Sequence, residues 1–401
     1  MKNNRWYALF WISIAQLFAL SLWFSATVII PDLKLIWTLS TFSEAFISAS
    51  VPLGFIFGAF FSAYFGLADR YNARTIFTIS ALLGAIINGL MIFTESAFIG
   101  IMFRFLTGVL LAGVYPIAVK LLALWFPKKR GLAIGILIAA LTLGSALPHF
   151  IVIIFESFQW QSIIITSSVL ACFAAIIMHF IVKDPPSKAQ KTVVSFKLLI
   201  NVVKNKPVML ANYGYFGHMW ELYAMWTWLP VFFTASFYSF SGETNLTLIA
   251  LASFLSIGVA GAIGCIVGGH IADKIGRARL TVIAMGVSSF CAILIGFTFG
   301  QTIWLTIIVA IVWGIFIIAD SAQFSAAVTE YADDEYVGTA LTFQMCIGFA
   351  ITIVTIQIIP LAQVYVGWQW AFSILSIGPI SGIISMLKLR KYEHIKEIPK
   401  K

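Results

Sequence analysis

The sequence predicts an all-α integral membrane protein with twelve transmembrane helices in two pseudo-symmetric six-helix bundles. Three observations support this prediction: the composition, twelve long apolar stretches, and a short loop that occurs once in each half. Of the 401 residues, 61% are hydrophobic and 10% are charged, whereas soluble proteins carry about 25% charged residues. Such a chain cannot cover a water-facing surface with polar groups. The composition therefore excludes a soluble enzyme, a disordered protein and a nucleic-acid-binding protein.

The apolar stretches are long enough to cross a bilayer as helices. A transmembrane helix needs about 20 apolar residues, and backbone groups in hydrocarbon must be paired within the segment. A β-barrel is disfavoured because its strands are about 10 residues long and alternate in hydrophobicity. We expect helices over residues 6–30, 42–65, 75–94, 97–123, 131–154, 160–182, 207–236, 246–269, 280–299, 302–329, 337–365 and 367–387.

The basic residues lie where a protein with both termini in the cytoplasm would carry them. Lys and Arg occur in the two termini and in alternate loops, whereas the opposite side carries only Lys34. This is the distribution that the positive-inside rule describes. The net charge of +9 is spread over the inner loops and does not form one nucleic-acid-binding patch. We expect a multi-pass protein of the plasma or inner membrane, whose first helix is retained.

The chain divides into two similar halves. A polar segment from Lys183 to Lys206 predicts an N-terminal bundle over residues 1–182, a cytoplasmic linker over 183–206, and a C-terminal bundle and tail over 207–401. Residues 66–74 read GLADRYNAR and residues 269–277 read GHIADKIGR, so the shared Asp is repeated 204 positions later. Two parallel six-helix repeats place a substrate site at their interface, near the membrane midplane.

The chain resembles the major facilitator superfamily over its whole length. The loop of this family between the second and third helices reads roughly G-x-L-A-D-R-x-G-R-K. The second copy matches it at Gly269, Ala272, Asp273, Gly276 and Arg277. In the first copy, Phe65 and Asn72 replace two glycines, and we expect Asn72 to keep the turn because Asn tolerates a left-handed conformation. The fourth helix also matches the family, with an Arg followed by spaced glycines at Arg104, Gly108 and Gly113.

The repeated loop is interpreted as a gate. An Asp at a helix end pairs with a nearby Arg and holds the cytoplasmic side in one access state. The predicted gating residues are Asp69, Arg70 and Arg74 in the first copy and Asp273, Lys274 and Arg277 in the second. The acidic run Glu330, Asp333, Asp334 and Glu335 is either their partner, through Arg70, Arg74 or Lys120, or a solvated loop.

Few ionisable residues lie within the predicted helices, where they are costly and usually functional. Four of them are the candidates for function, Arg104, His218, Glu221 and Asp320. The resemblance implies that helices one, four, seven and ten surround the central cavity, and three of these four carry the ionisable residues. Burial disfavours the charged form of Glu221, which makes it a candidate proton carrier.

His218 lies three residues from Glu221 on the same helical face and would relay or tune its proton. Asp320 is either a second proton site or a static partner of Lys120. Arg104 would bind an anionic substrate or balance Glu221, and the family associates an Arg at this position with proton coupling. The alternative is an Arg that extends toward the outer membrane interface.

The seventh helix is unusually aromatic, which suits an organic solute better than a bare ion. Trp220 and Tyr223 are predicted to line the cavity, whereas Trp226 and Trp228 are predicted to lie at the lipid interface. Further candidates for substrate binding are Arg104, Gln16, Trp23, Tyr115, Gln323 and Gln344.

These features predict a secondary transporter that works by alternating access, with proton-coupled uptake of a small organic solute, including organic anions. A proton-antiport exporter is the alternative, although the fifth helix lacks the Gly-Pro pair of many exporters. A non-transporting receptor is a third hypothesis. No P-loop, nucleophile motif or metal-ligand cluster occurs, and the four cysteines form no CxxC pair. We therefore expect no enzyme activity and no cofactor, the proton as coupling ion, and a monomer in the lipid bilayer. Nitrate is disfavoured because helices two and eight contain no Arg.

Overall fold

The computed structural model describes the backbone of residues 2–126, 130–155, 159–186, 198–333 and 336–397, without the side chains of 2–4, 68–69, 130–131 and 393–397. The described residues form helices and no strand. The N-terminal half contains α1 (Lys2–Phe24), α2 (Ile30–Trp37), α3 (Thr41–Tyr64), α4 (Leu67–Arg70), α5 (Ala73–Gly89), α6 (Ala97–Leu111), α7 (Tyr115–Trp125), α8 (Arg130–Ile154) and α9 (Gln161–Ile176). After α10 (Leu199–Lys204), which lies in the predicted linker, the C-terminal half contains α11 (Lys206–Ser241), α12 (Leu246–Ser253), α13 (Ala260–Ile275), α14 (Arg277–Phe297), α15 (Ile303–Ala319), α16 (Ser321–Tyr331), α17 (Val337–Ala371) and α18 (Ile377–Glu397).

These elements make twelve membrane-crossing helices. In the described part of the chain, ten segments are long and apolar enough to cross a membrane. The last of them, Val337–Tyr392, contains two crossings, because Gly367 interrupts it with φ 72° and ψ 169°. The twelfth is α11, which has 36 residues and a lower hydropathy because of its many Tyr and Trp residues. The predicted number of helices is therefore confirmed.

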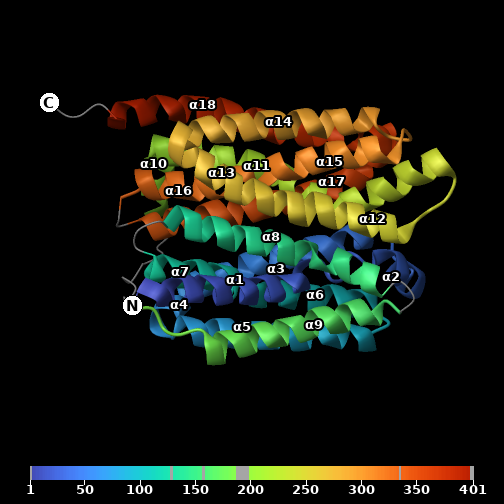
Figure 1. The fold of residues 1–401 in the computed structure, drawn as a ribbon, viewed down its shortest axis with the longest axis horizontal. Coiled ribbons are helices and arrows are strands. Elements are labelled where there is room, and N and C mark those ends of the chain that lie inside the picture. Colours follow the sequence, from blue (N-terminus) through green and yellow to red (C-terminus); the bar gives the residue numbers. More distant parts are fainter. Residues whose placement is uncertain (1, 127–129, 156–158, 187–197, 334–335, 398–401) are drawn as a thin grey trace.

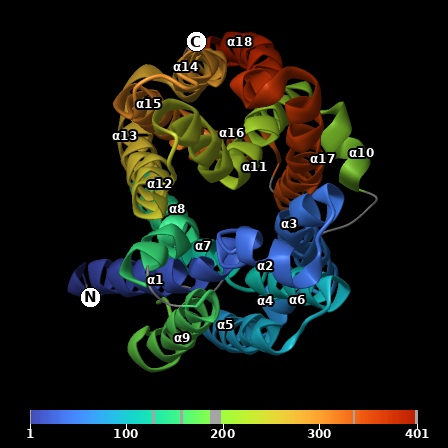
Figure 2. The same cartoon turned by 90° about the vertical axis from the view of Figure 1, so that its right-hand side faces the viewer.

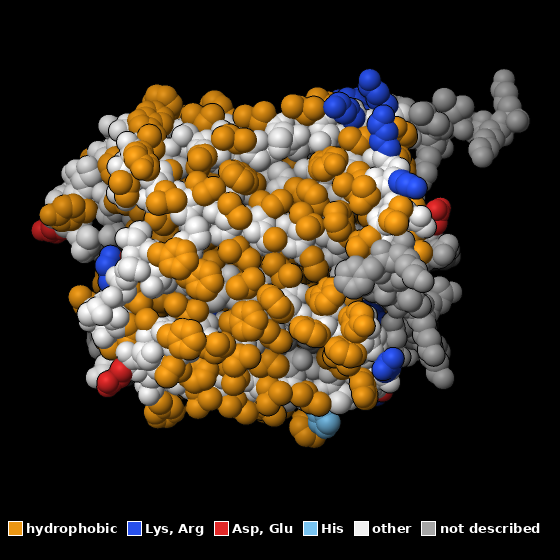
Figure 3. Space-filling model, turned by 180° about the vertical axis from the view of Figure 1, so that it is seen from behind, with side chains coloured by type: hydrophobic (Ala, Val, Ile, Leu, Met, Phe, Trp, Pro, Cys, Tyr) orange, Lys and Arg blue, Asp and Glu red, His pale blue; other side chains and the backbone are white. Residues whose placement is uncertain are grey.

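The helices run side by side along the long axis of the molecule (Figure 1) and form two bundles when viewed end-on (Figure 2). The bundles meet along two seams, where α3 packs on α17 and where α8 packs on α12 and α13. A broad hydrophobic surface covers the sides of the molecule, and basic side chains gather at the end where α1 begins and α18 ends (Figure 3). Such a surface suits a multi-pass membrane protein, because hydrocarbon surrounds the sides and water surrounds the ends.

A close helix crossing is repeated in the two halves. A Cβ atom on Gly54 of α3 would lie 1.9 Å from the carbonyl oxygen of Phe105 on α6, and a Cβ atom on Gly264 of α13 would lie 2.1 Å from that of Ile315 on α15. Gly264 follows Gly54 by 210 positions, and Ile315 follows Phe105 by the same 210 positions. Only glycine permits this approach of two backbones. The crossing is direct structural evidence of the internal repeat.

The fourth membrane helix of each half is broken near its middle. In the N-terminal half α6 ends at Leu111 and α7 begins at Tyr115, with Pro116 in its first turn. In the C-terminal half α15 ends at Ala319 and α16 begins at Ser321, so that Asp320 lies at the break. Asp and Ser compete with the helical backbone for hydrogen bonds and favour helix ends. The break therefore places a carboxyl group at a helix end inside the membrane.

The two copies of the repeated loop form their turns in different ways. Gly276 has φ 91° and ψ 151°, a region that only glycine adopts readily. Asn72, at the matching position, has φ −62° and ψ 125°, and its side chain accepts hydrogen bonds from the backbone of Arg74 and Thr75. The expectation of a left-handed Asn72 is therefore wrong. The turn is replaced by an N-cap, for which Asn is among the best residues.

Candidate functional site

Five Arg, His, Asp or Glu side chains are buried in the described part of the chain, each with an exposed fraction of at most 4%. Four of them are the residues that the sequence predicted, Arg104, His218, Glu221 and Asp320. The fifth is His149 of α8, which sequence reasoning missed although it lies inside the predicted helix 131–154. Its position among apolar residues was the available indication.

His218 and Asp320 form a buried pair at the break between α15 and α16. The Nδ1 atom of His218 lies 2.9 Å from Oδ1 of Asp320, and both side chains are at most 2% exposed. The rings of Tyr215 and Phe324 pack around the imidazole, with centroids 6.0 and 5.5 Å away. The second ring nitrogen, Nε2, is buried without a hydrogen-bond partner. Asp320 is therefore bound by His218, whereas the sequence left open a pairing with Lys120.

Glu221 occupies a separate polar pocket inside the C-terminal bundle. Its Oε1 accepts a hydrogen bond from Nε1 of Trp313 on α15 at 2.6 Å, and its Oε2 accepts one from Oγ of Ser288 on α14 at 2.9 Å. The sequence paired Glu221 with His218 on one helical face. The structure gives His218 a different partner, Asp320.

Arg104 is bound by the end of α1. Its Nη1 donates to the carbonyl of Leu22 at 2.9 Å, to Oγ of Ser25 at 3.1 Å and to Oδ1 of Asn88 at 2.9 Å, and its Nη2 donates to the carbonyl of Trp23. The last carbonyls of a helix have no partner within the helix, and a cation there is favoured by the helix dipole. With an exposed fraction of 0%, Arg104 does not extend to the membrane interface, and its bonds hold the chain where α1 ends.

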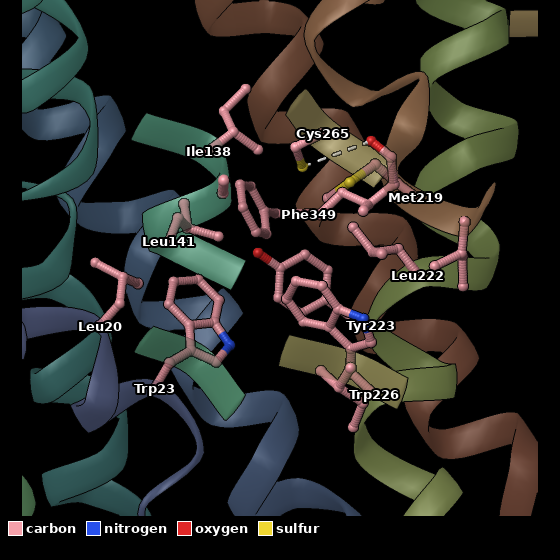
Figure 4. Packing of buried hydrophobic residues seen from close by; sticks show 14 of the residues in the cluster. Leu20, Trp23, Ile138, Leu141, Met219, Leu222, Tyr223, Trp226, Cys265 and Phe349 are labelled. Carbon is pink, nitrogen blue, oxygen red and sulfur yellow. Dashed lines mark hydrogen bonds between the residues drawn. The ribbon is translucent and has the colours of Figure 1, made fainter. Parts of the chain in front are cut away.

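An aromatic cluster joins the two halves. Trp23 of α1 and Phe55 of α3 approach Tyr223 of α11 and Phe349 of α17, and Phe24 packs against Tyr223. The centroids of Trp23 and Tyr223 are 5.4 Å apart, and those of Phe55 and Phe349 are 4.7 Å apart. Figure 4 shows Trp23 facing Tyr223 and Trp226 across the interface. These contacts close the space between the bundles at this level.

Three tryptophans of α11 do not lie where the sequence placed them. Trp226 is 1% exposed and packs against Phe24 of the other half. Trp228 is 6% exposed and donates to the carbonyl of Ile356 on α17. The prediction of a lipid interface for both is wrong, because neighbouring helices and the other half surround the middle of α11. Trp220, predicted to line the central cavity, packs against Gly378 of α18, and its Nε1 donates to the carbonyl of Ile374.

Two of the other predicted substrate residues lie toward the interface. Gln16 is seven residues, or two helical turns, before Trp23 and thus on the same face of α1. It is fully buried, and both polar atoms of its amide lack a hydrogen-bond partner. Tyr115 begins α7 at the break and packs against the core cluster to which both halves contribute. Across the seam, Sγ of Cys265 on α13 lies 3.9 Å from Oγ1 of Thr142 on α8.

Gln323 and Gln344 belong to polar contacts within the C-terminal half. Oε1 of Gln323 accepts from Nη1 of Arg277 at 2.9 Å. Gln344 of α17 donates to Oδ1 of Asn212 at 3.1 Å and accepts from Ser325 at 3.0 Å. The structure therefore brings Gln16, Trp23, Tyr115 and Tyr223 toward the interface, and it gives Gln323 and Gln344 partners inside one bundle.

Two of the three predicted gating arginines, Arg74 and Arg277, bind acidic residues. Nη1 of Arg74 lies 3.2 Å from Oδ2 of Asp184, after α9. Nη2 of Arg277 lies 2.7 Å from Oε1 of Glu330 on α16. The acidic run thus contacts the second copy of the loop through Glu330, whereas Arg74, which the sequence left open as its partner, binds Asp184. The predicted residues Arg70, Asp273 and Lys274 are exposed, and the side chain of Asp69, like Asp334 and Glu335, lies outside the described part.

No group of three or more His, Cys, Asp or Glu side chains with the arrangement of a metal site occurs among the described residues. The four cysteines are free.

The comparisons with known proteins agree with this architecture. A model of the Major Facilitator Superfamily matches residues 12–356. The chain is 24% identical over 253 residues to the probable sulfoacetate transporter SauU of Cupriavidus necator. This alignment covers 56% of this chain and 56% of the relative. The chain is also 29% identical over 213 residues to the putative niacin/nicotinamide transporter NiaP of Bacillus subtilis. That alignment covers 50% of this chain and 52% of the relative. The matched region thus spans about half the length of these curated relatives.

The fold is similar to a crystal structure of the nucleoside transporter NupG. The TM-score is 0.71 at 13% sequence identity, and the match covers 95% of this chain and 99% of that one. At this identity the similarity concerns the fold alone.

Proposed function

Because the chain belongs to the Major Facilitator Superfamily, we propose that it carries a small organic solute across the membrane by alternating access, driven by inward proton movement. The protein is a multi-pass membrane protein and not an enzyme. Its relatives SauU and NiaP are named for sulfoacetate and for niacin or nicotinamide. Small organic acids are therefore the first solutes to test, and both termini are proposed to lie in the cytoplasm.

The observation that carries this proposal is the buried pair of His218 and Asp320. Two titratable groups 2.9 Å apart can hold one or two exchangeable protons between them. Gain or loss of a proton by either group would alter this contact. Asp320 lies at a helix break, and Cys265, whose Sγ lies 4.0 Å from the carbonyl oxygen of Ile318, contacts the other half. A change of protonation would therefore act where the two bundles touch.

Glu221 is proposed as a second proton group that is coupled to the pair. Both carboxyl groups are buried in one bundle, and where two titratable groups interact, their proton content belongs to both residues together. The hydrogen bonds from Trp313 and Ser288 hold the carboxylate form of Glu221 in place. In this proposal Asp320 exchanges the transported proton and Glu221 adjusts how readily it does so.

The solute is proposed to bind between the bundles, among the groups that face each other there. Gln16 offers an unpaired donor and acceptor, and Tyr115, Trp23 and Tyr223 offer aromatic faces with one polar atom each. Arg104 is proposed to act through α1 and not by contact with the solute, because its donors bind the residues at the end of that helix.

The test is uptake by proteoliposomes under an imposed pH gradient, with a panel of organic acids and the variants Asp320→Asn and His218→Asn. We expect one or more solutes to accumulate together with protons in the wild type. Asp320→Asn should lose this accumulation but keep exchange of labelled for unlabelled solute, because exchange needs no net proton transfer. Glu243→Gln, which alters an exposed carboxyl group, is the matched control and should transport normally.

The opposite sign of proton movement would assign the protein to proton-antiport export. Accumulation that persists in both Asp320→Asn and Glu221→Gln would contradict proton coupling through these residues. Absence of both accumulation and exchange for the whole panel would contradict the proposed class of solute.

A further inference from the structure

A cavity on the outside of the C-terminal bundle has no role in the proposed transport cycle. It has a volume of about 320 Å³ and lies between α11, α17 and α18. Its lining includes Tyr213 and Trp220 of α11, Ile351 of α17, and Ile377, Ser381 and Ser385 of α18. Tyr213 and Ile377 are 51% and 58% exposed. The cavity is therefore open on the side of the molecule, among residues of the membrane helices α11, α17 and α18.

The floor of this groove is formed by a close approach of two backbones. A Cβ atom on Gly217 of α11 would lie 2.4 Å from the carbonyl oxygen of Gly378 on α18. Because neither residue has a side chain, the surface is hollow at this crossing. Trp220 forms one wall, and its Nε1 is already bound to the carbonyl of Ile374. The interior of the groove is thus mainly apolar and fits hydrocarbon.

The polar end of the groove faces the end of the molecule where α11 begins and α18 ends. Along α18, Ser381, Ser385 and Lys388 follow one another at spacings of four and three residues, which keeps them on one face. Along α11, Lys206 precedes Tyr213 by seven residues, or two turns. Both lysines are exposed, and neither forms an ion pair within the part of the chain that the structure describes. Basic side chains also gather at this end in Figure 3.

We propose that this groove binds one anionic phospholipid of the surrounding bilayer, with an acyl chain between α11 and α18 and the phosphate at Lys206 and Lys388. The arrangement follows the order of groups in a lipid. Hydrocarbon contacts the apolar floor, the ester region meets Ser385 and Tyr213, and the phosphate meets the lysines at the depth where the helices leave the membrane. Lysines at this depth attract anionic headgroups.

Charge complementarity favours a phospholipid over other occupants of the groove. A second copy of the chain would present the same lysines and would repel them. An uncharged apolar compound would fill the hydrocarbon part but would gain nothing from the lysines. The proposal is independent of the transported solute and of proton coupling, since it rests on the outer surface alone.

The test is native mass spectrometry of the purified full-length protein, titrated with dioleoylphosphatidylglycerol or dioleoylphosphatidylcholine. We expect the wild type to bind one phosphatidylglycerol more tightly than phosphatidylcholine. The double variant Lys206→Gln/Lys388→Gln should lose roughly tenfold or more of this preference, because each lysine contributes to headgroup attraction. Lys183→Gln/Arg279→Gln removes two exposed basic residues of the chain outside the groove and should keep it.

A second variant tests the groove itself. Ser381→Trp fills the groove from an exposed position and should weaken both lipids while the thermal unfolding temperature stays near that of the wild type. Equal binding of the two lipids by the wild type, or an unchanged preference in the double lysine variant, would overturn the headgroup assignment. Unchanged lipid binding in Ser381→Trp would overturn the groove as the site. A dimer that Ser381→Trp abolishes would show that a second copy is the occupant.

Discussion

Arg104 in the N-terminal half and Asp320 in the C-terminal half are both buried charged residues in the fourth membrane helix of their bundle, but their partners differ. Arg104 binds two backbone carbonyls, a hydroxyl and an amide oxygen. Asp320 binds the imidazole of His218. Arginine keeps its proton in any environment, whereas an imidazole and a carboxyl group exchange protons. In the N-terminal half the buried charge thus binds structural oxygen atoms, whereas in the C-terminal half it faces a group that can exchange a proton, as the proposed transport cycle requires.

Removal of the Arg104 side chain should have the largest effect on stability. Arg104→Leu removes the donor that the acceptors of Leu22, Trp23, Ser25 and Asn88 share. The Ser25 hydroxyl also reaches Leu22 and Asn88 and can still serve one of them. Each remaining buried unpaired group costs about 1–3 kcal/mol, so the loss should be on the order of 3 kcal/mol. Thermal unfolding in detergent should show a larger decrease in Tm than a single substitution at a glycine crossing or a helix cap.

The control for this comparison is Arg104→Lys, which keeps the charge but has fewer donors in a different geometry. It should recover part of the Tm. If Arg104→Leu unfolded like the wild type but no longer bound an anionic solute, Arg104 would instead contact the solute.

The repeated glycine crossing should be equally sensitive in the two halves. Gly54→Ala and Gly264→Ala each place a methyl group against a backbone oxygen, and overpacking of this kind costs about 1–3 kcal/mol. Gly269→Ala is the control, because a Cβ atom there meets nothing within 4 Å. The two glycine variants would lose different amounts of Tm if the helices around the two crossings packed differently. That result would show that the halves share a backbone arrangement but not the same side-chain packing.

The pair of His218 and Asp320 should show a coupling energy that Arg104 and Asp320 lack. In a double-mutant cycle with His218→Asn and Asp320→Asn, direct contact should give a coupling of roughly 0.5–3 kcal/mol. The same cycle with Arg104→Lys and Asp320→Asn should be additive, since the two residues have separate partners. Reversible unfolding measured for all variants supplies both values.

The smallest expected effect concerns the two copies of the loop. Asn72→Ala removes an N-cap and should cost about 1 kcal/mol, whereas Asn72→Gly should cost only a few tenths. Gly276→Asn should be more harmful than Asn72→Gly, because its φ and ψ suit glycine alone. The Tm of each of the three variants measures these losses of stability. If Asn72→Gly and Gly276→Asn lowered the Tm equally, the two copies of the loop would form the same turn.

Much of the architecture was predictable from the sequence, because long apolar runs and a repeated loop are properties of single segments. The rarity of buried charges likewise identified Arg104, His218, Glu221 and Asp320. Their partners were not predictable. Two of the four acceptors of Arg104 are backbone carbonyl oxygens at the end of α1, and every sequence has such oxygens. Trp226 and Trp228 were misplaced because the pattern of α11 does not reveal that other helices surround it.

The glycine crossing near Gly54 and its counterpart near Gly264 bear on how such a chain evolves. At this crossing, the close approach of the two helices in each bundle depends on a glycine, which has no side chain, and not on buried polar groups. Substitutions on the surfaces that face each other can therefore accumulate without reshaping either bundle. Descendants of one duplicated ancestor can in this way diverge in the compounds they recognise while they inherit the same framework.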